Sequence, residues 1–146
     1  MRQVGRWLMR GFLAAQVHIY RLSSGRIGGK VSGLPVLLLT TIGRKTGNPR
    51  TTVVMYQTDG DRLVVTATNN GADRHPGWYH NLRSNPNVEV EVGSELSKVH
   101  ARVTEGEERA IRYQRFVDAL NRFRTYQERT SRTIPVVVLE PHQPAT

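Results

Sequence analysis

Residues 34–57 read LPVLLLTTIGRKTGNPRTTVVMYQ, which is two strand-like runs on either side of a basic turn. The first run, 34–42, is short, apolar and bounded by turn residues, which is typical of a buried strand. The second, 51–57, is rich in β-branched residues and also indicates a strand. Between them, residues 43–50 place three cations, a threonine hydroxyl and two glycines in eight positions. This stretch predicts a hairpin with a cationic turn.

Other strands are expected at similar short spacing along the rest of the chain. The Asp59-Gly60 pair is a hairpin signal. Val88, Val90 and Val92 alternate with glutamates, so that strand has one face in water. The remaining strands are expected at 63–68, 98–103 and 134–139.

Three helices are expected. Residues 4–22 carry apolar positions at helical spacing, with arginines on another face. A short helix is expected at 76–82, with Pro76 at its start. Thr104 and Glu107 fit a capping box, which predicts a helix that runs to about Phe123. Since hairpin spacing dominates and no βαβ unit is visible, we expect an α+β, mainly β protein: a mostly antiparallel, closed or partly closed barrel with flanking helices.

The composition fits one domain with a strongly asymmetric charge. The chain has 146 residues and a net charge of +9, and its first fifty residues contain nine cations and no acid. Such a field attracts polyanions or anionic surfaces. The chain has no cysteine, which excludes thiol nucleophiles, disulfides and cysteine-based metal sites. We expect an amphipathic helix and connector over 1–33, a barrel over 34–141, and a loose tail over 142–146.

Two segments could carry chemistry. The turn at 43–50 could cradle an anion with its backbone amides and cations, or it could be an ordinary solvated loop. In the segment 75–82, two aromatic residues could flank a flat ring, or Trp78 and Leu82 could simply be core anchors. His75 and His80 are five apart, a poor match to the i, i+4 pair of a helical metal site, so we expect no metal there. If the protein is an enzyme, the reactive atoms are expected on a bound organic cofactor.

Four blocks of the sequence resemble the deazaflavin-dependent nitroreductase family. They are LLLTTIGRKTGNPR at 37–50, Asp59-Gly60, HPGWYHNLRSNPNVEVEV at 75–92 and RTIPVVVLEP at 132–141. The resemblance runs in unbroken order from about Pro35 to Pro141. It implies a split β-barrel and an oxidoreductase that passes a hydride from reduced coenzyme F420 to a quinone or a nitro-type acceptor.

The resemblance also implies a role for individual residues. The coenzyme's phosphate and glutamate tail would lie on Arg44, Lys45, Thr46 and Arg50, followed along the strand by Thr51 and Thr52. The deazaflavin would lie near Thr66, Ala67, Thr68 and Asn69. The short helix that closes over the cofactor would contribute Gly77, Trp78 and Tyr79. Tyr126 matches a tyrosine near the substrate pocket and is the candidate proton donor. Leu120 and Phe123 replace tyrosines that line the acceptor pocket.

Alternatives remain open from the residues alone. Split barrels also host FMN or haem, so the fold does not decide the cofactor. A basic module that binds nucleic acid or a membrane surface would suit the charge, but the cations show no nucleic-acid motif and we expect no nucleic-acid partner. The N-terminal helix could pack on the domain or lie on an anionic bilayer. We expect a cytoplasmic protein, with this helix as the candidate for peripheral contact at the inner face of the membrane.

Overall fold

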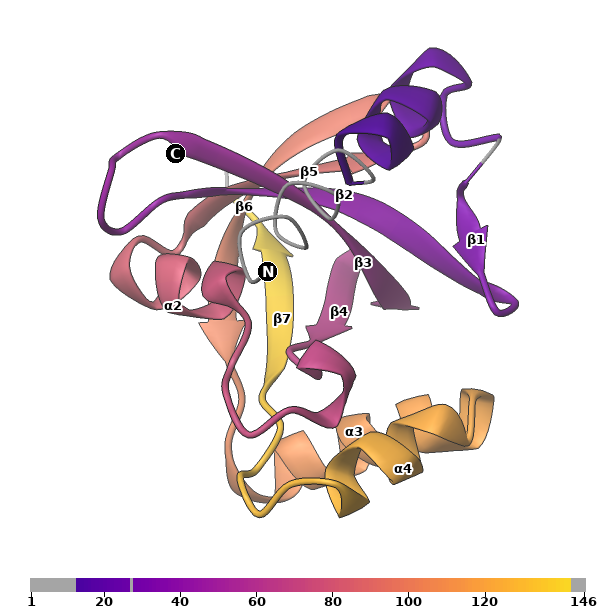
Figure 1. Ribbon diagram of the computed structural model, residues 1–146, viewed down its shortest axis with the longest axis vertical. Coiled ribbons are helices and arrows are strands. Elements are labelled where there is room, and N and C mark those ends of the chain that lie inside the picture. The colour runs from indigo at the N-terminus through magenta and orange to yellow at the C-terminus, as the bar shows by residue number, and fades with distance from the viewer. Residues whose placement is uncertain (1–12, 27, 143–146) are drawn as a thin grey trace, which may run out of the picture.

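The computed structural model describes residues 13–26 and 28–142 (Figure 1). The strands are β1 (Lys30–Val31), β2 (Leu34–Ile42), β3 (Pro49–Asp59), β4 (Arg62–Thr66), β5 (Asn87–Val92), β6 (Glu95–Val103) and β7 (Val136–Pro141). Besides an N-terminal helix over residues 13–22, the helices are the 3-10 turn η1 (Asn69–Gly71), α2 (Gly77–Ser84), α3 (Gly106–Ala119) and α4 (Arg122–Glu128).

Six of the strands close into a barrel. They follow one another in the order β2-β3-β4-β7-β6-β5, and β5 pairs back with β2. Strand β2 closes the barrel because it pairs with a strand on each side. Its Leu39, for example, lies opposite Thr52 of β3 on one side and Val90 of β5 on the other. Every pairing among the described strands is antiparallel. The expected mainly β split barrel with flanking helices is confirmed.

The helices cover different parts of the barrel. Figure 1 shows α3 and α4 together at one end and the N-terminal helix at the opposite end. One apolar cluster fills the barrel and includes Leu82 of α2. A second lies under α3 and α4 around Phe116, which is fully buried. A third joins Tyr20 of the N-terminal helix to β2. Burial of these apolar faces fixes where each helix lies on the barrel.

The N-terminal helix packs on the barrel over its described part. The Tyr20 hydroxyl lies within hydrogen-bond distance of the carbonyls of Val36 (3.3 Å) and Glu91 (3.2 Å), and it accepts from the Gly93 amide at 2.8 Å. Arg21 pairs with the Glu91 carboxylate at 2.9 Å. Residues 4–12 of the predicted helix lie outside the described residues. No helix within the described residues is both long and apolar enough to cross a membrane.

The predicted helix from Thr104 to Phe123 differs from the observed structure at both ends. Its proposed capping box is wrong, because the Thr104 hydroxyl donates to the Val136 carbonyl at 2.9 Å and no side chain caps the helix. The helix is also divided. Leu120 adopts extended backbone angles after α3, and α4 begins at Arg122. The chain turns there because Phe123 must reach the same buried cluster as Phe116.

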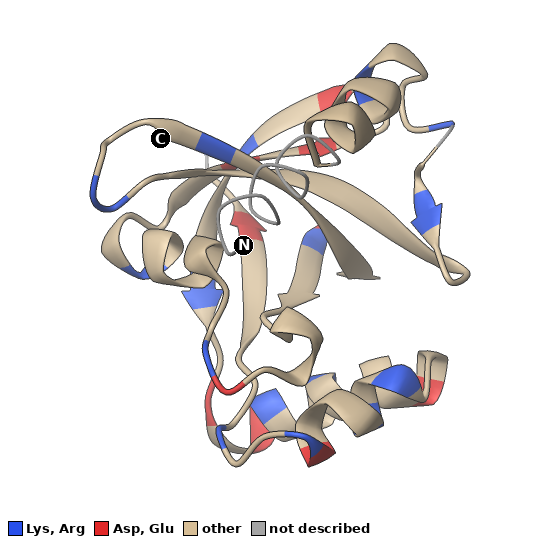
Figure 2. Cartoon of the chain, in the orientation of Figure 1, with Lys and Arg blue, Asp and Glu red and all other residues tan. Residues whose placement is uncertain are grey.

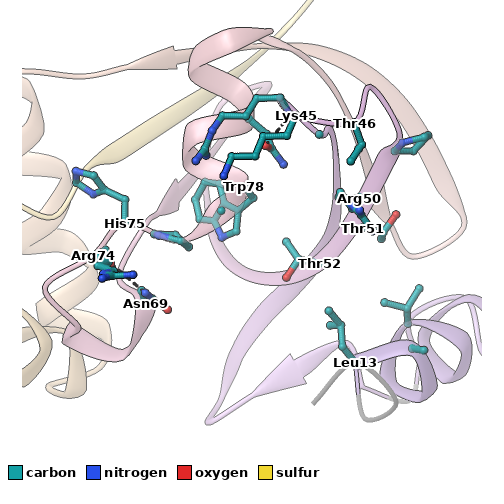
Figure 3. Close-up of a pocket in the computed structure, with 18 of the residues that line it drawn as sticks. Leu13, Lys45, Thr46, Arg50, Thr51, Thr52, Asn69, Arg74, His75 and Trp78 are labelled. Atoms are coloured by element: carbon teal, nitrogen blue, oxygen red, sulfur yellow. Dashed lines mark hydrogen bonds between the residues drawn. The ribbon is translucent and has the colours of Figure 1, made fainter. Parts of the chain in front are cut away.

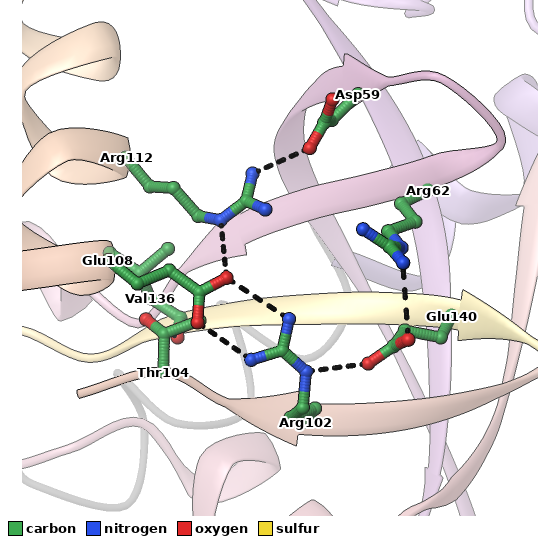
Figure 4. Close-up of polar contacts among 8 residues, drawn as sticks. All are labelled: Asp59, Arg62, Arg102, Thr104, Glu108, Arg112, Val136 and Glu140. Atoms are coloured by element: carbon green, nitrogen blue, oxygen red, sulfur yellow. Dashed lines mark hydrogen bonds and ion pairs between the residues drawn. The ribbon is translucent and has the colours of Figure 1, made fainter.

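A chain of ion pairs ties α3 to the barrel (Figure 4). It links two strands, a hairpin and a helix through alternating charges, in the order Asp59, Arg112, Glu108, Arg102, Glu140 and Arg62. Hydrogen bonds from Arg102, and to a lesser extent from Arg112, lower the pKa of Glu108 to about 2. Except for the buried Arg112, these groups are partly solvent-exposed, so most of the pairs contribute modestly to stability.

Candidate functional site

The turn between β2 and β3 is shaped by hydrogen bonds within itself. The Gly43 amide donates to the Asn48 carbonyl at 2.8 Å, and the Gly47 amide donates to the Gly43 carbonyl at 2.7 Å. Gly47 has a φ of +73°, a conformation that favours glycine. A Cβ at position 43 would lie 2.8 Å from Thr46 Oγ1. The turn therefore keeps its shape without help from its cationic side chains.

A buried amide fastens this turn to α2. The Asn81 side chain accepts from the backbone amide of Arg44 at 3.1 Å and donates to the Thr41 hydroxyl at 3.1 Å. Asn81 and Thr41 are both buried, and each satisfies the other's polar group. The single amide thus holds the end of β2, the basic turn and the helix that carries Trp78 in one arrangement.

An open groove of about 1180 Å³ lies beside the turn (Figure 3). The basic turn and the start of β3 form one wall, and the start of α2 with Trp78 forms another. Asn69 and residues 74–76 continue the lining next to α2. The N-terminal helix completes it with Leu13, Ala14, Val17, His18 and Arg21. Figure 3 shows Leu13 lying across the groove from Trp78.

The groove is cationic. Arg44, Lys45, Arg50 and Arg74 all line it and are exposed, and no carboxylate within the described part of the chain forms an ion pair with them. Its lining contains no aspartate or glutamate. Figure 2 shows the β2–β3 loop and α2 without any acidic segment. Unpaired cations around backbone amides are suited to hold phosphate and carboxylate groups.

His75, which lines the groove, and His80 on α2 add little charge. Burial, followed by the nearby Arg132, His80 and Arg83, lowers the pKa of His75. Burial, followed by Arg44 and Arg83, also lowers the pKa of His80. Both imidazoles are therefore mainly neutral at pH 7, and the positive field comes from the arginine and lysine side chains.

A smaller cavity of about 350 Å³ adjoins the groove. Tyr126 and Phe123 form one side, and the strand residues Thr52 and Thr66 contribute to another. The two spaces share four lining residues, namely Thr52, Asn69, Pro76 and Trp78. Within the described residues, no hydrogen bond engages the Tyr126 hydroxyl, although its ring packs 5.9 Å from that of Phe123. A flat ligand beside Trp78 could contact a second molecule in the smaller cavity.

The comparisons with known proteins agree with this geometry. A sequence profile of the F420H(2)-dependent quinone reductase family matches residues 12–141. The chain belongs to this family. It is 45% identical over 144 residues to an F420H(2)-dependent quinone reductase of Mycobacterium tuberculosis, a match that covers 93% of this chain and 97% of that protein.

Solved structures support the same assignment. The F420H2-dependent reductase FDR-A is 36% identical, with a TM-score of 0.67 over 73% of this chain and 94% of that one. The heme storage protein HutZ of Vibrio cholerae is 14% identical, with a TM-score of 0.58 over 90% of this chain and 92% of that one, and this likeness shows the fold alone. As a member of the F420H(2)-dependent quinone reductase family, the chain is an oxidoreductase that uses reduced F420 as its hydride donor.

The residues of the groove fit that coenzyme. F420 carries a phosphate and several carboxylates on its tail, and the groove offers four exposed cations that form no ion pair with a described residue, with no acid in its lining. Its volume exceeds that of an ordinary small-ligand pocket, as a coenzyme with a long tail requires. Trp78 gives a flat aromatic surface where the groove meets the smaller cavity.

The structure brings most of the expected site residues together. Around the groove lie Arg44, Lys45, Thr46, Arg50, Thr51, Thr52, Asn69, Gly77 and Trp78. Thr66, Thr68 and Tyr126 line the smaller cavity. Ala67 and Tyr79 line neither space: both are buried in the barrel cluster, where Tyr79 also accepts a hydrogen bond from Arg83 at 2.9 Å. Their side chains therefore pack in the barrel core behind the site and do not line it.

Sequence reasoning missed several residues of the site. The wall contributed by the N-terminal helix follows from packing, because an amphipathic pattern does not say which surface the helix covers. Asn81 acts through partners far away in the sequence, the Arg44 amide and the Thr41 hydroxyl. The sequence did offer one signal for Asn81. Helical spacing puts this polar residue on the same face of the short helix as the apolar residues Trp78 and Leu82.

Proposed function

We propose that F420 binds with its acidic tail on the 43–50 turn and its ring beside Trp78. The observation that carries this proposal is the set of exposed, unpaired cations on a turn that is rigid without them. The turn and Trp78 are joined through Asn81, so binding of the tail and placement of the ring are mechanically linked.

The chain's own residues bind, orient and exclude water. Arg44, Lys45 and Arg50 hold the tail, and the Thr46 and Thr51 hydroxyls add polar contacts. Trp78 and the N-terminal helix form walls of the groove and limit the access of water to the reacting face. Reduced F420 supplies the hydride when bound. The smaller cavity holds the acceptor next to the ring, because it opens onto the same four residues as the groove.

We assign the acceptor to the quinone class. The cavity combines apolar contacts from Phe123 and Met55 with threonine and asparagine groups, as a quinone with an apolar tail and polar carbonyls requires. Nitroaromatic compounds have the same flat shape and polar edge, and we propose that they are accepted as well. The Tyr126 hydroxyl can donate a proton to the reduced acceptor, since it forms no hydrogen bond with any described residue.

This proposal is tested with purified protein, F420 and menadione. Reduced F420 should be oxidised only when protein and quinone are both present, followed by the return of F420 absorbance. A Tyr126→Phe variant should bind F420 as the wild type does and turn over more slowly. Equal turnover by this variant would assign the proton to solvent, whereas absence of F420 binding by the wild type would refute the proposed site.

We also propose peripheral contact with an anionic membrane surface, where quinones reside. Leu22 is 75% exposed and Ile19 is 45% exposed on the N-terminal helix, and the neighbouring cations in the sequence are Arg26 and Arg21, which is paired with Glu91. An apolar residue flanked by cations is typical of interfacial helices. Co-sedimentation with phosphatidylglycerol vesicles should fall on Leu22→Asp substitution. Unchanged or absent binding would contradict this contact.

A further inference from the structure

The guanidinium of Arg132 is fully engaged by neutral acceptors. Its Nε donates to the carbonyl of Ala72 at 2.8 Å, and its Nη2 donates to the carbonyl of Thr68 at 2.8 Å and of Ala67 at 3.3 Å. Its Nη1 also reaches Ala67 O, at 3.2 Å, and lies 3.0 Å from His75 Nδ1. These five contacts match the five N–H groups of an arginine. No carboxylate of the described chain forms an ion pair with it.

The carbonyls that Arg132 binds lie on both sides of a strained turn. Asn69, Asn70 and Gly71 follow one another with φ values of +46°, +55° and +77°. Such left-handed residues persist only where their surroundings hold them. Gly71 also allows close packing, because a Cβ there would lie 2.8 Å from the Tyr126 carbonyl. Arg132 thus ties together the carbonyls before and after a turn that contacts both the groove and the Tyr126 helix.

The position of Arg132 is itself fixed. Its carbonyl accepts from Gln127 Nε2 at 2.7 Å, and Gln127 Oε1 accepts from the Ile134 amide at 3.1 Å and from Arg109 at 2.7 Å. The neighbouring Asp73 carboxylate accepts from the Thr130 hydroxyl at 2.8 Å. A network between α4 and β7 therefore holds the guanidinium behind the 67–75 segment.

The contact with His75 has a definite proton arrangement. A guanidinium only donates hydrogen bonds, so His75 Nδ1 must accept with its lone pair. The imidazole is then neutral, with its proton on Nε2, and protonation would set two N–H groups against each other. Nε2 has no partner among the described residues, and His75 lines the groove. Its ring is steadied by Tyr79 at 4.5 Å and His80 at 5.6 Å between centroids.

We propose that Arg132 is a positioning residue of the coenzyme site: it holds the 67–75 segment in its bound shape and fixes His75 as the Nε2–H tautomer, which donates to an oxygen of the coenzyme. The second half of this inference rests on the proposed placement of F420. The first half concerns the free protein and is tested without any ligand.

The free protein is tested by imidazole nitrogen NMR on ¹⁵N-labelled wild type near pH 7. The chain has five histidines, and the spectrum of His75→Gln identifies the His75 signals. The expected result is one tautomer, with a pyridine-like Nδ1 and a protonated Nε2. Arg132→Lys keeps the positive charge but loses the planar guanidinium with its several N–H donors. In this variant the His75 nitrogen signals should move to the average of the two tautomers. A wild-type His75 with its proton on Nδ1, or on both nitrogens, would overturn the proposal.

The role toward the coenzyme is tested by F420 fluorescence titration and steady-state turnover. Arg132→Lys should lower kcat/KM by about tenfold to a hundredfold, as misplaced active-site groups do. Arg122→Lys is the matched control, since Arg122 lies exposed on α4 without a described contact, and it should behave as the wild type. An Arg132→Lys enzyme with wild-type kinetics would refute the positioning role.

Two substitutions of His75 separate its two nitrogens. His75→Asn keeps an acceptor for Arg132 but loses the outer donor, and it should weaken F420 binding about tenfold at unchanged melting temperature, a loss of about 1.4 kcal/mol. His75→Gln keeps an outer N–H group and should restore most of the affinity. Equal affinity of both variants would refute the donor role, even where Arg132→Lys fails to fold.

Discussion

Replacing Arg44 and Lys45 together by alanine should weaken F420 binding strongly without unfolding the protein. Both side chains are exposed and have no carboxylate partner among the described residues. The backbone bonds of Gly43 and the Asn81 contact to the Arg44 amide do not involve either side chain. The melting temperature should therefore change little.

The expected size of the effect follows from how exposed these cations are. A charge-assisted hydrogen bond contributes about 1.5–3 kcal/mol when desolvated, and a fully exposed ion pair contributes about 0.2–1 kcal/mol. Arg44 and Lys45 lie on an open groove, so about 1–1.5 kcal/mol each is a reasonable intermediate value. The double variant should then lose about 2–3 kcal/mol, which corresponds to roughly 30-fold to 150-fold in Kd.

The assay is titration of F420 by fluorescence at low and at high salt. Salt should weaken binding by the wild type more than by the double variant, because screening acts on charges that the variant lacks. Lys98→Ala with Arg122→Ala is the control: it removes the same net charge from strand β6 and helix α4, outside the groove lining. A double variant with wild-type affinity would refute the reasoning. An equal loss in the control would mean that the overall field, rather than the turn, attracts the coenzyme.

Three further outcomes are expected. In a Trp7→Phe variant, which leaves Trp78 as the sole tryptophan, F420 should quench tryptophan fluorescence; no quenching would place the ring elsewhere. Asn81→Leu should lower the free energy of unfolding by about 1–3 kcal/mol in denaturant titrations, because the buried Thr41 hydroxyl and the part-buried Arg44 amide lose their hydrogen bonds, and should weaken F420 binding with an unchanged salt dependence. The folded-state pKa of Glu108 is depressed to about 2, so its contribution is present above the unfolded value near 4.5 and is lost as pH falls toward 2. Glu108→Gln should therefore cost about 1 kcal/mol at pH 7 and only a small part of that at pH 2, and a pH-independent cost would contradict the ion-pair account.

The barrel could be predicted from sequence because its signals are local. The apolar run of β2 and the alternating valines of β5 mark strands by periodicity, and Pro76 marks the start of α2 within one residue. The basic turn was equally visible, since its cations and glycines are neighbours in the chain.

The parts that escaped prediction depend on distant partners. The Thr104 hydroxyl fits a helix cap by spacing, but it is used by Val136, which is 32 residues away. Arg132 donates to the carbonyls of Ala67 and Thr68, which lie 65 and 64 residues away in the sequence, and no local pattern predicts these hydrogen bonds. The break at Leu120 is likewise set by burial of Phe123 rather than by a proline or glycine.

The most direct test of the whole account is a crystal structure of the protein with F420 bound. The account predicts density for the phosphate and carboxylates of the tail against the 43–50 turn, with the deazaflavin ring beside Trp78 and its reactive face open to the cavity that holds Tyr126. A complex in which the turn stays free of the coenzyme, with the tail bound at another surface, would contradict it.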